Sequence, residues 1–171
     1  EPIPVTTTPT LRERIIERIF AYLKEIEDCG VVLDYASEGD ADLTSINEAL
    51  NAGKYAIEVL PGQSEPLALT SATKINAHTW ELPVMLLVHL PQSADVKPYQ
   101  QVARICATVF KAVHPNEFAE GTWDGLAIQT RWESGTDGAE VFVDPKTGLK
   151  STAMTFRVMY RHAFHDPAVQ A

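Results

Sequence analysis

The sequence predicts an α+β fold, in which an antiparallel-rich mixed β-sheet carries two main α-helices on one face and a β-hairpin projects from it. Residues 11–26 and 98–113 place apolar side chains at the spacing of an amphipathic helix. Several runs between and after them alternate apolar and polar residues, as half-buried strands do. The order helix, strands, helix, strands favours an α+β protein with helices on one sheet face. We expect an extended arm at 1–9, a single domain at 10–167 and a short tail at 168–171.

The arm is expected to be either disordered or laid on a neighbour, because it holds prolines and threonines without a periodic apolar face. Thr10 and Glu13 then have the T-x-x-E spacing of a capping box, which satisfies two N–H groups at the start of a helix. We expect Gly30 to end this first helix at its C′ position.

The region after the first helix is predicted to contain a short strand at 31–35 and then an acidic loop within 36–53. Residues 43–50 are expected to close one or two helical turns inside it. The candidate acidic residues, for this loop or for a ring lumen, are Glu38, Asp40 and Asp42. Their alternate spacing superficially resembles a calcium-binding loop, but the glycine and glutamate of such a loop are missing from the required positions. A solvated acidic loop is therefore the expectation.

The middle of the chain contains three more alternating runs. Residues 55–59 form a clear strand pattern, residues 67–76 a weaker one, and residues 79–90 the most apolar one. Because the centre of the last run is apolar on both faces, we expect it to lie centrally in the sheet with a helix on one side. Residues 140–143, between two glycine-containing turns, are predicted to form the projecting hairpin.

The last predicted strand, residues 151–165, has the most regular alternation. Its expected buried face consists of Met154, Phe156, Val158 and Tyr160. Arg157 and Arg161 fall on the opposite face. We expect the outer end, with Arg161, His162 and His165, to project beyond the sheet.

Composition and charge argue against nucleic-acid gripping and membrane insertion. Lysine and arginine number 14 against 23 acidic residues, which gives a formal net charge of −9 and a pI near 4.9. An acidic surface disfavours nonspecific attraction to DNA phosphates. The longest apolar run, residues 82–90, is far shorter than the ~20 residues of a membrane-spanning helix. Cys29 and Cys106 are expected to be buried free thiols.

The sequence contains few of the motifs that are typical of enzymes. It has neither a glycine-rich phosphate loop nor a G-x-S-x-G nucleophile motif. His162 and His165 would face opposite sides of a strand, which disfavours a shared metal. We therefore expect no catalytic activity, cofactor or metal. The alternative is a small hydrolase or ligand-binding domain that uses His89, His162 and nearby carboxylates, and it requires at least two of these groups to converge in a pocket.

Interface residues are the more plausible functional groups. Trp123 and Trp132 are candidate anchors of a subunit interface, where aromatic residues are enriched, and a core role is the alternative for both. Arg157, Arg161 and His162 are further candidates, because they lie on or beside the polar side of the last strand. Salt bridges to an acidic neighbour are the functional interpretation of the two arginines, and solvated charge is the alternative.

Four features occur in a recognisable order: a leading amphipathic helix, the strand WELPVMLLVHLP, a second helix of about four turns and the closing strand FRVMYRHAFHDP. The most specific is the ending, with Tyr160-Arg161 followed by Asp166-Pro167. In this order the chain resembles, over residues 11–167, the tail terminator and tail-completion proteins of long-tailed bacteriophages. The acidic loop and the hairpin extension depart from shorter members of that family.

The resemblance implies a virion structural protein of the phage tail or neck, assembled in the host cytoplasm. It would be a homo-oligomer, expected as a hexameric ring, that caps the tail tube and contacts the tube protein. On its other side it would meet the head-side connector or stopper protein, and DNA would pass through an acidic lumen without being gripped. Another neck or head-completion ring would share much of the pattern. A cellular adaptor whose acidic loop binds a basic partner is a further possibility.

Overall fold

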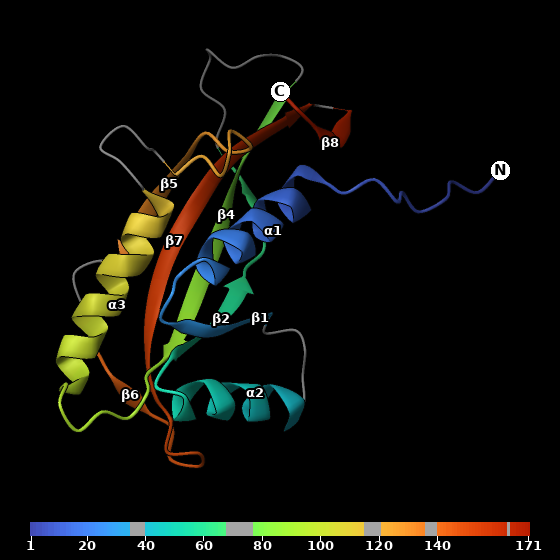
Figure 1. Cartoon of the computed structure of the whole chain (residues 1–171). Helices are drawn as coiled ribbons and strands as arrows, with labels where there is room; N and C mark the ends of the chain where they lie inside the picture. Colours follow the sequence, from blue (N-terminus) through green and yellow to red (C-terminus); the bar gives the residue numbers. More distant parts are fainter. Residues whose placement is uncertain (35–39, 68–76, 115–120, 136–139, 164) are drawn as a thin grey trace.

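A computed structural model describes residues 1–34, 40–67, 77–114, 121–135, 140–163 and 165–171. These contain three helices and eight strands (Figure 1). In chain order they are α1 (Leu11–Lys24), β1 (Cys29–Asp34), α2 (Asp40–Asn51), β2 (Tyr55–Pro61), β3 (Glu65–Pro66), β4 (Ala77–His89), α3 (Pro98–Val113), β5 (Gln129–Ser134), β6 (Phe142–Val143), β7 (Lys150–Ala163) and β8 (Asp166–Gln170). The α+β fold class is confirmed.

The sheet is built around β4 and β7. Its main strands lie in the order β1-β2-β4-β7-β5, with β3 attached to β4, and β6 and β8 attached to β7. Only β1 and β2 are parallel among these pairs. β4 pairs with β7 without interruption from Ala77 opposite Ala163 to His89 opposite Ser151. The apolar β4 therefore lies centrally, as its sequence predicts.

The main core lies between the sheet and the two long helices, which cross the same face of it in Figure 1. α1 contributes a fully buried stripe of Leu11, Ile15, Ile19 and Leu23. From β7 the predicted set Met154, Phe156, Val158 and Tyr160 is buried in the same core. The period of 3.6 in the helix and of 2 in the strand thus brings two apolar surfaces together.

The remaining helix, α2, packs on the opposite face of the sheet. Ala56 and Ile57 are successive residues of β2, so their side chains point to opposite faces. Ile57 belongs to the main core, whereas Ala56 is buried with Ile46 and Ala49 of α2. The prediction of one or two helical turns here was too short, since α2 has 12 residues. Asp40 and Asp42 consequently lie in a helix and not in a loop.

The first helix begins where predicted and ends earlier. Thr10 and Glu13 form the predicted capping box in both directions. The helix ends at Lys24, however, and Gly30 lies inside β1. The glycine at position 30 has another reason: a Cβ there would come within 2.6 Å of the Ala49 Cβ, so glycine permits the close approach of α2 to β1.

The outer end of the last strand differs from its prediction. It does not project beyond the sheet, because β7 stays paired with β4 as far as Ala163. The chain then reverses into β8, which pairs back onto β7 with His162 opposite Gln170. Residues 168–170, expected in a tail, therefore belong to a strand. The Asp166 carboxylate accepts a hydrogen bond from the Ala168 N–H at 2.9 Å, which helps to form this reversal.

The predicted hairpin is present as β6 and the start of β7, with Phe142 opposite Ser151. Its turn is closed by the Asp144 carboxylate, which accepts hydrogen bonds from the N–H groups of Lys146 and Thr147. These two bonds lower the pKa of Asp144. The weaker strand pattern at 67–76 lies almost wholly outside the described residues.

Two further expectations concern the cysteines and the membrane. Cys29 and Cys106 are free, and Cys106 is buried while Cys29 is half-buried. Burial raises the pKa of the Cys106 thiol to about 11. Of the helices described, none has both the length and the apolar composition that crossing a bilayer requires.

We expect Thr152→Val to raise the free energy of unfolding by about 1 kcal/mol, measured by urea titration. Thr152 of β7 is fully buried, and its Oγ1 finds no hydrogen-bond partner among the described residues. Valine has nearly the same shape and leaves no polar atom in the core. The matched control is Thr130→Val, which we expect to lose about 1–3 kcal/mol, because Thr130 Oγ1 accepts from Trp123 and donates to the Gly121 carbonyl. Equal effects at the two positions would contradict this account.

Candidate functional site

The surface available for a partner is the sheet face opposite α1 and α3, which we call the open face. Among the described residues, the only helix that packs on this face is α2, and it covers the end formed by β1 and β2. The uncovered centre carries an apolar strip of half-buried or exposed side chains from three strands. The strip consists of Leu60, Pro83, Met85, Leu87 and Ala153, and Thr155 lies beside it. An uncovered apolar strip on a sheet is a typical contact surface.

A cluster of charged side chains borders this strip, and Arg157 is at its centre. The Arg157 Nε donates to Glu133 Oε1, and its Nη1 lies 3.6 Å from Glu81 and 3.7 Å from Glu65. Arg131 contacts the same Glu81 at 3.5 Å. The hydrogen bond and charge of Glu133, with the other two carboxylates, raise the pKa of Arg157. Arg157 is thus on the open face as predicted, but its acidic neighbours belong to its own chain.

The other two polar candidates of the last strand are also held within the chain. The Arg161 Nε donates to Thr79 Oγ1 at 3.0 Å across the β4–β7 pair. The His162 ring stacks on Trp80, with 5.8 Å between ring centres and 18° between planes. Both side chains therefore hold the outer ends of β4 and β7 together, which corrects their expected projection from the sheet.

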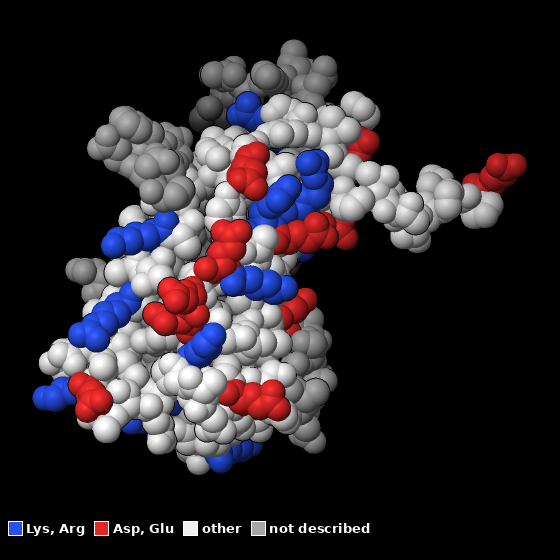
Figure 2. Space-filling model, viewed as in Figure 1, with Lys and Arg blue, Asp and Glu red and all other residues white. Residues whose placement is uncertain are grey.

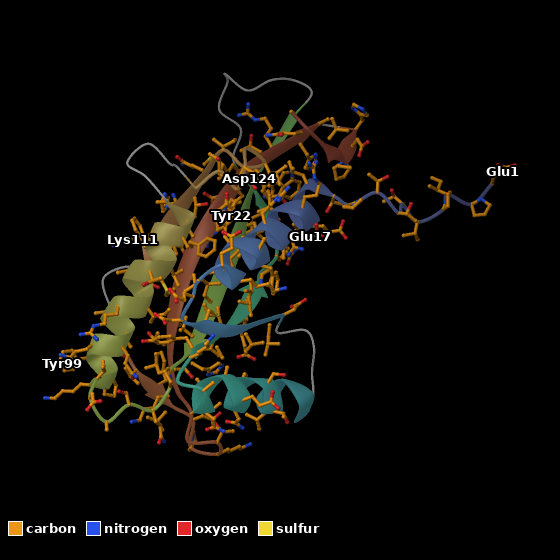
Figure 3. The ribbon with its side chains drawn as sticks, in the orientation of Figure 1. Glu1, Glu17, Tyr22, Tyr99, Lys111 and Asp124 are labelled. Atoms are coloured by element: carbon orange, nitrogen blue, oxygen red, sulfur yellow. The ribbon has the colours of Figure 1, made fainter. Side chains whose placement is uncertain are left out.

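Trp123 is not an exposed interface anchor, because its side chain is only 3% exposed. Its indole N–H donates to Thr130 Oγ1 at 2.8 Å, and its ring stacks on Phe156. Tyr22 of α1 meets the same loop: its ring contacts the edge of Trp123 and its hydroxyl donates to Asp124. That hydrogen bond, with burial, raises the pKa of Tyr22. Figure 3 shows Tyr22 and Asp124 near one another at the α1 end of this contact.

Trp132 is half-buried and also packs inward. Its indole N–H donates to His114 Nε2 at 2.9 Å, and its ring centre is 4.9 Å from that of Phe156. Phe110 of α3 lies against the same indole. The core alternative therefore describes both tryptophans. Of the acidic candidates, Glu38 lies outside the described residues, and Asp40 and Asp42 belong to the first turn of α2.

A polar group that sequence reasoning missed connects β2, β4 and β7. His89 Nδ1 lies 2.6 Å from Ser151 Oγ, and His89 Nε2 lies 2.9 Å from Glu58 Oε2. The sequence suggested His89 as a possible catalytic group, but its pairing with His162 is wrong. The two histidines sit at opposite ends of the β4–β7 ladder, where 11 residues of β4 at about 3.3 Å each separate their positions. The register of three strands, which no local pattern reveals, brings Ser151 to His89.

This serine, histidine and glutamate arrangement is closed to substrate. Ser151 and His89 are 7% and 6% exposed. They lie on the face that α2 covers, since His89 pairs with Ala56 of the α2 cluster. Acyl transfer needs a hydroxyl that can reach a carbonyl carbon, and a buried hydroxyl cannot. The group gives hydrogen-bond partners to two buried side chains, His89 and Ser151, and to the half-buried Glu58, and it connects three strands.

The described residues contain no group of three or more histidine, cysteine, aspartate or glutamate side chains placed to hold a metal ion. No protein-family model matches the chain, and no curated protein matches it either.

Proposed function

We propose that this protein is a non-enzymatic virion subunit, a tail terminator-type ring protein that caps the tail tube of a long-tailed phage. The observation that carries the proposal is the apolar surface that a single chain leaves exposed, on the arm and on the open face. The arm at residues 1–9 extends away from the body in Figure 1, and Ile3 and Val5 on it are 94% and 93% exposed. Together with the apolar strip of the open face, these side chains favour burial against other copies or a tube.

The edges of the sheet support assembly as well. Among the described strands, β1 pairs only with β2, and β5 pairs only with β7. The other side of each is not paired with any strand that the structure describes, so a strand of another chain could add there. A contact between two different surfaces, repeated by rotation, closes into a ring.

The charge of the chain is compatible with a ring through which DNA passes. A net charge of −9 repels phosphates, so a lumen formed by such subunits would not hold the genome. On the face shown in Figure 2, acidic and basic side chains are interspersed. Mixed charge of this kind favours specific pairing with a charged neighbour over nonspecific adhesion.

The test is the mass of the purified protein, alone and with polymerised tail tubes of the phage that encodes it. We expect a species of six times the 18.9 kDa chain mass, seen by mass photometry, and electron micrographs with a cap at one end of each tube. Tubes of an unrelated phage are the control. A protein that stays monomeric under both conditions and leaves the tube ends bare would overturn the proposal.

A further inference from the structure

The extended arm has a backbone pattern suited to one-sided strand pairing. In an extended chain, the N–H and C=O groups of one residue point to one side, and those of the next residue point to the other side. Pro2 and Pro4 fall on one side, which therefore lacks two donors, whereas Ile3, Val5 and Thr7 keep theirs on the other. Proline in this arrangement is tolerated at the edge of a sheet and blocks addition of a further strand. The arm can thus complete a sheet edge and end it.

The same alternation places both apolar side chains of the arm on one face. Ile3 and Val5 point to the same side of an extended chain, because they are two residues apart. Each is almost fully exposed on the isolated chain. Burying a side chain of this size is worth about 1.5–3 kcal/mol, so the arm favours a partner that offers a free strand edge beside an apolar surface.

Such a surface lies beside the outer edge of β1. A hollow of about 560 Å³ opens there, and it includes Ile16 and Phe20 of α1 and Asp34 at the end of β1. Ile16 and Phe20 are half-buried and lie beside the buried stripe of α1. Residues 5–10 of the chain's own arm form one wall of this hollow, and α1 forms the other. A strand that pairs with the outer edge of β1 would therefore lie close to two apolar side chains that it could cover.

We propose that the arm of one copy pairs with the outer edge of β1 in a second copy, where Ile3 and Val5 cover Ile16 and Phe20. The start of the arm extends away from the body: Figure 3 shows Glu1 far from α1, whose Glu17 lines the hollow. Eight extended residues reach about 26–29 Å. Each subunit then gives one arm and receives one, and this head-to-tail contact closes a ring. The inference rests on the proposed ring and specifies the contact that holds it.

The first experiment removes the arm or its apolar face and measures assembly by mass photometry over a range of concentrations. Deletion of residues 1–8, and the double variant Ile3→Asp with Val5→Asp, should raise the concentration needed for assembly at least about tenfold, since each 1.4 kcal/mol is tenfold. The control, Phe142→Asp with Val143→Asp, adds the same charge at two exposed apolar residues of β6 and should assemble as the unmodified protein does. The arm variants should keep the unmodified melting temperature, because Ile3 and Val5 are almost fully exposed on the isolated chain.

The second experiment identifies the chain that receives the arm. In a background with Cys29 and Cys106 replaced by alanine, copies carrying Val5→Cys are mixed with copies carrying Phe20→Cys and oxidised. We expect a disulfide-linked band of two chains only in the mixture. A chain that carries both Val5→Cys and Phe20→Cys is oxidised separately at high dilution. A disulfide formed within single copies of that chain would overturn the proposal.

The outcomes separate this inference from the proposed function. If arm-deleted protein forms the same rings and still caps tubes, the arm contact is wrong and the ring function stands. If the intact protein never assembles, alone or with tubes, both fail.

Discussion

Phe156→Ala is expected to lower the free energy of unfolding by about 3–5 kcal/mol, a large share of the 5–15 kcal/mol that stabilises a typical domain. Phe156 of β7 is 1% exposed and lies between the two indoles that the sequence suggested as interface anchors. Its ring centre is 6.0 Å from that of Trp123 and 4.9 Å from that of Trp132. Alanine would leave a cavity between these rings, which β-sheet hydrogen bonds prevent from closing.

The measurement is urea-induced unfolding followed by tryptophan fluorescence, which reports on both indoles directly. The matched control is Phe142→Ala in β6, whose side chain is 53% exposed and should lose no more than about 0.5–1 kcal/mol. If the two variants lost similar stability, the packing of the tryptophans around Phe156 would not be the centre of this core.

Periodic elements of this fold could be predicted from sequence, because one chain segment contains all the information they need. The alternation of β7 gave its buried face correctly, from Met154 to Tyr160. The capping box at Thr10 is likewise a local contact between residues three apart. Even the position of β4 follows from its own composition, since a strand that is apolar on both sides is stable only within a sheet.

Features that depend on contacts between distant segments were predicted badly. Gly30 looked like a helix terminator, and only the approach of Ala49 from α2 explains it. Trp123 sits between two glycines in a loop, so no period reports that it turns inward to Thr130. Arg157 was placed on the polar face correctly, but its carboxylates come from three other strands. In each case a strand register or a helix position decides, and neither is encoded locally.

The second large effect is expected for Gly121→Ala, which should lower the free energy of unfolding by about 2–5 kcal/mol. Gly121 has φ of +68°, which alone costs an alanine about 1–2 kcal/mol. An added Cβ would also lie 2.7 Å from Thr130 Cβ and 2.9 Å from Thr130 Oγ1. Relief of that overlap requires Thr130 to move, and overpacking of this kind costs about 1–3 kcal/mol.

The contact matters because Thr130 Oγ1 is the atom that fixes the Trp123 loop. It donates to the Gly121 carbonyl at 2.7 Å and accepts from the Trp123 indole at 2.8 Å. Displacement of this hydroxyl breaks both bonds in a buried place, and the loop loses its attachment to β5. Gly125→Ala is the matched control: its φ of +81° carries the same backbone cost, but no atom lies within 4 Å of the added Cβ. The melting temperatures of the two variants should therefore differ only by the effect of the overlap with Thr130. Equal melting temperatures would mean that the backbone conformation, and not the approach to Thr130, requires glycine at position 121.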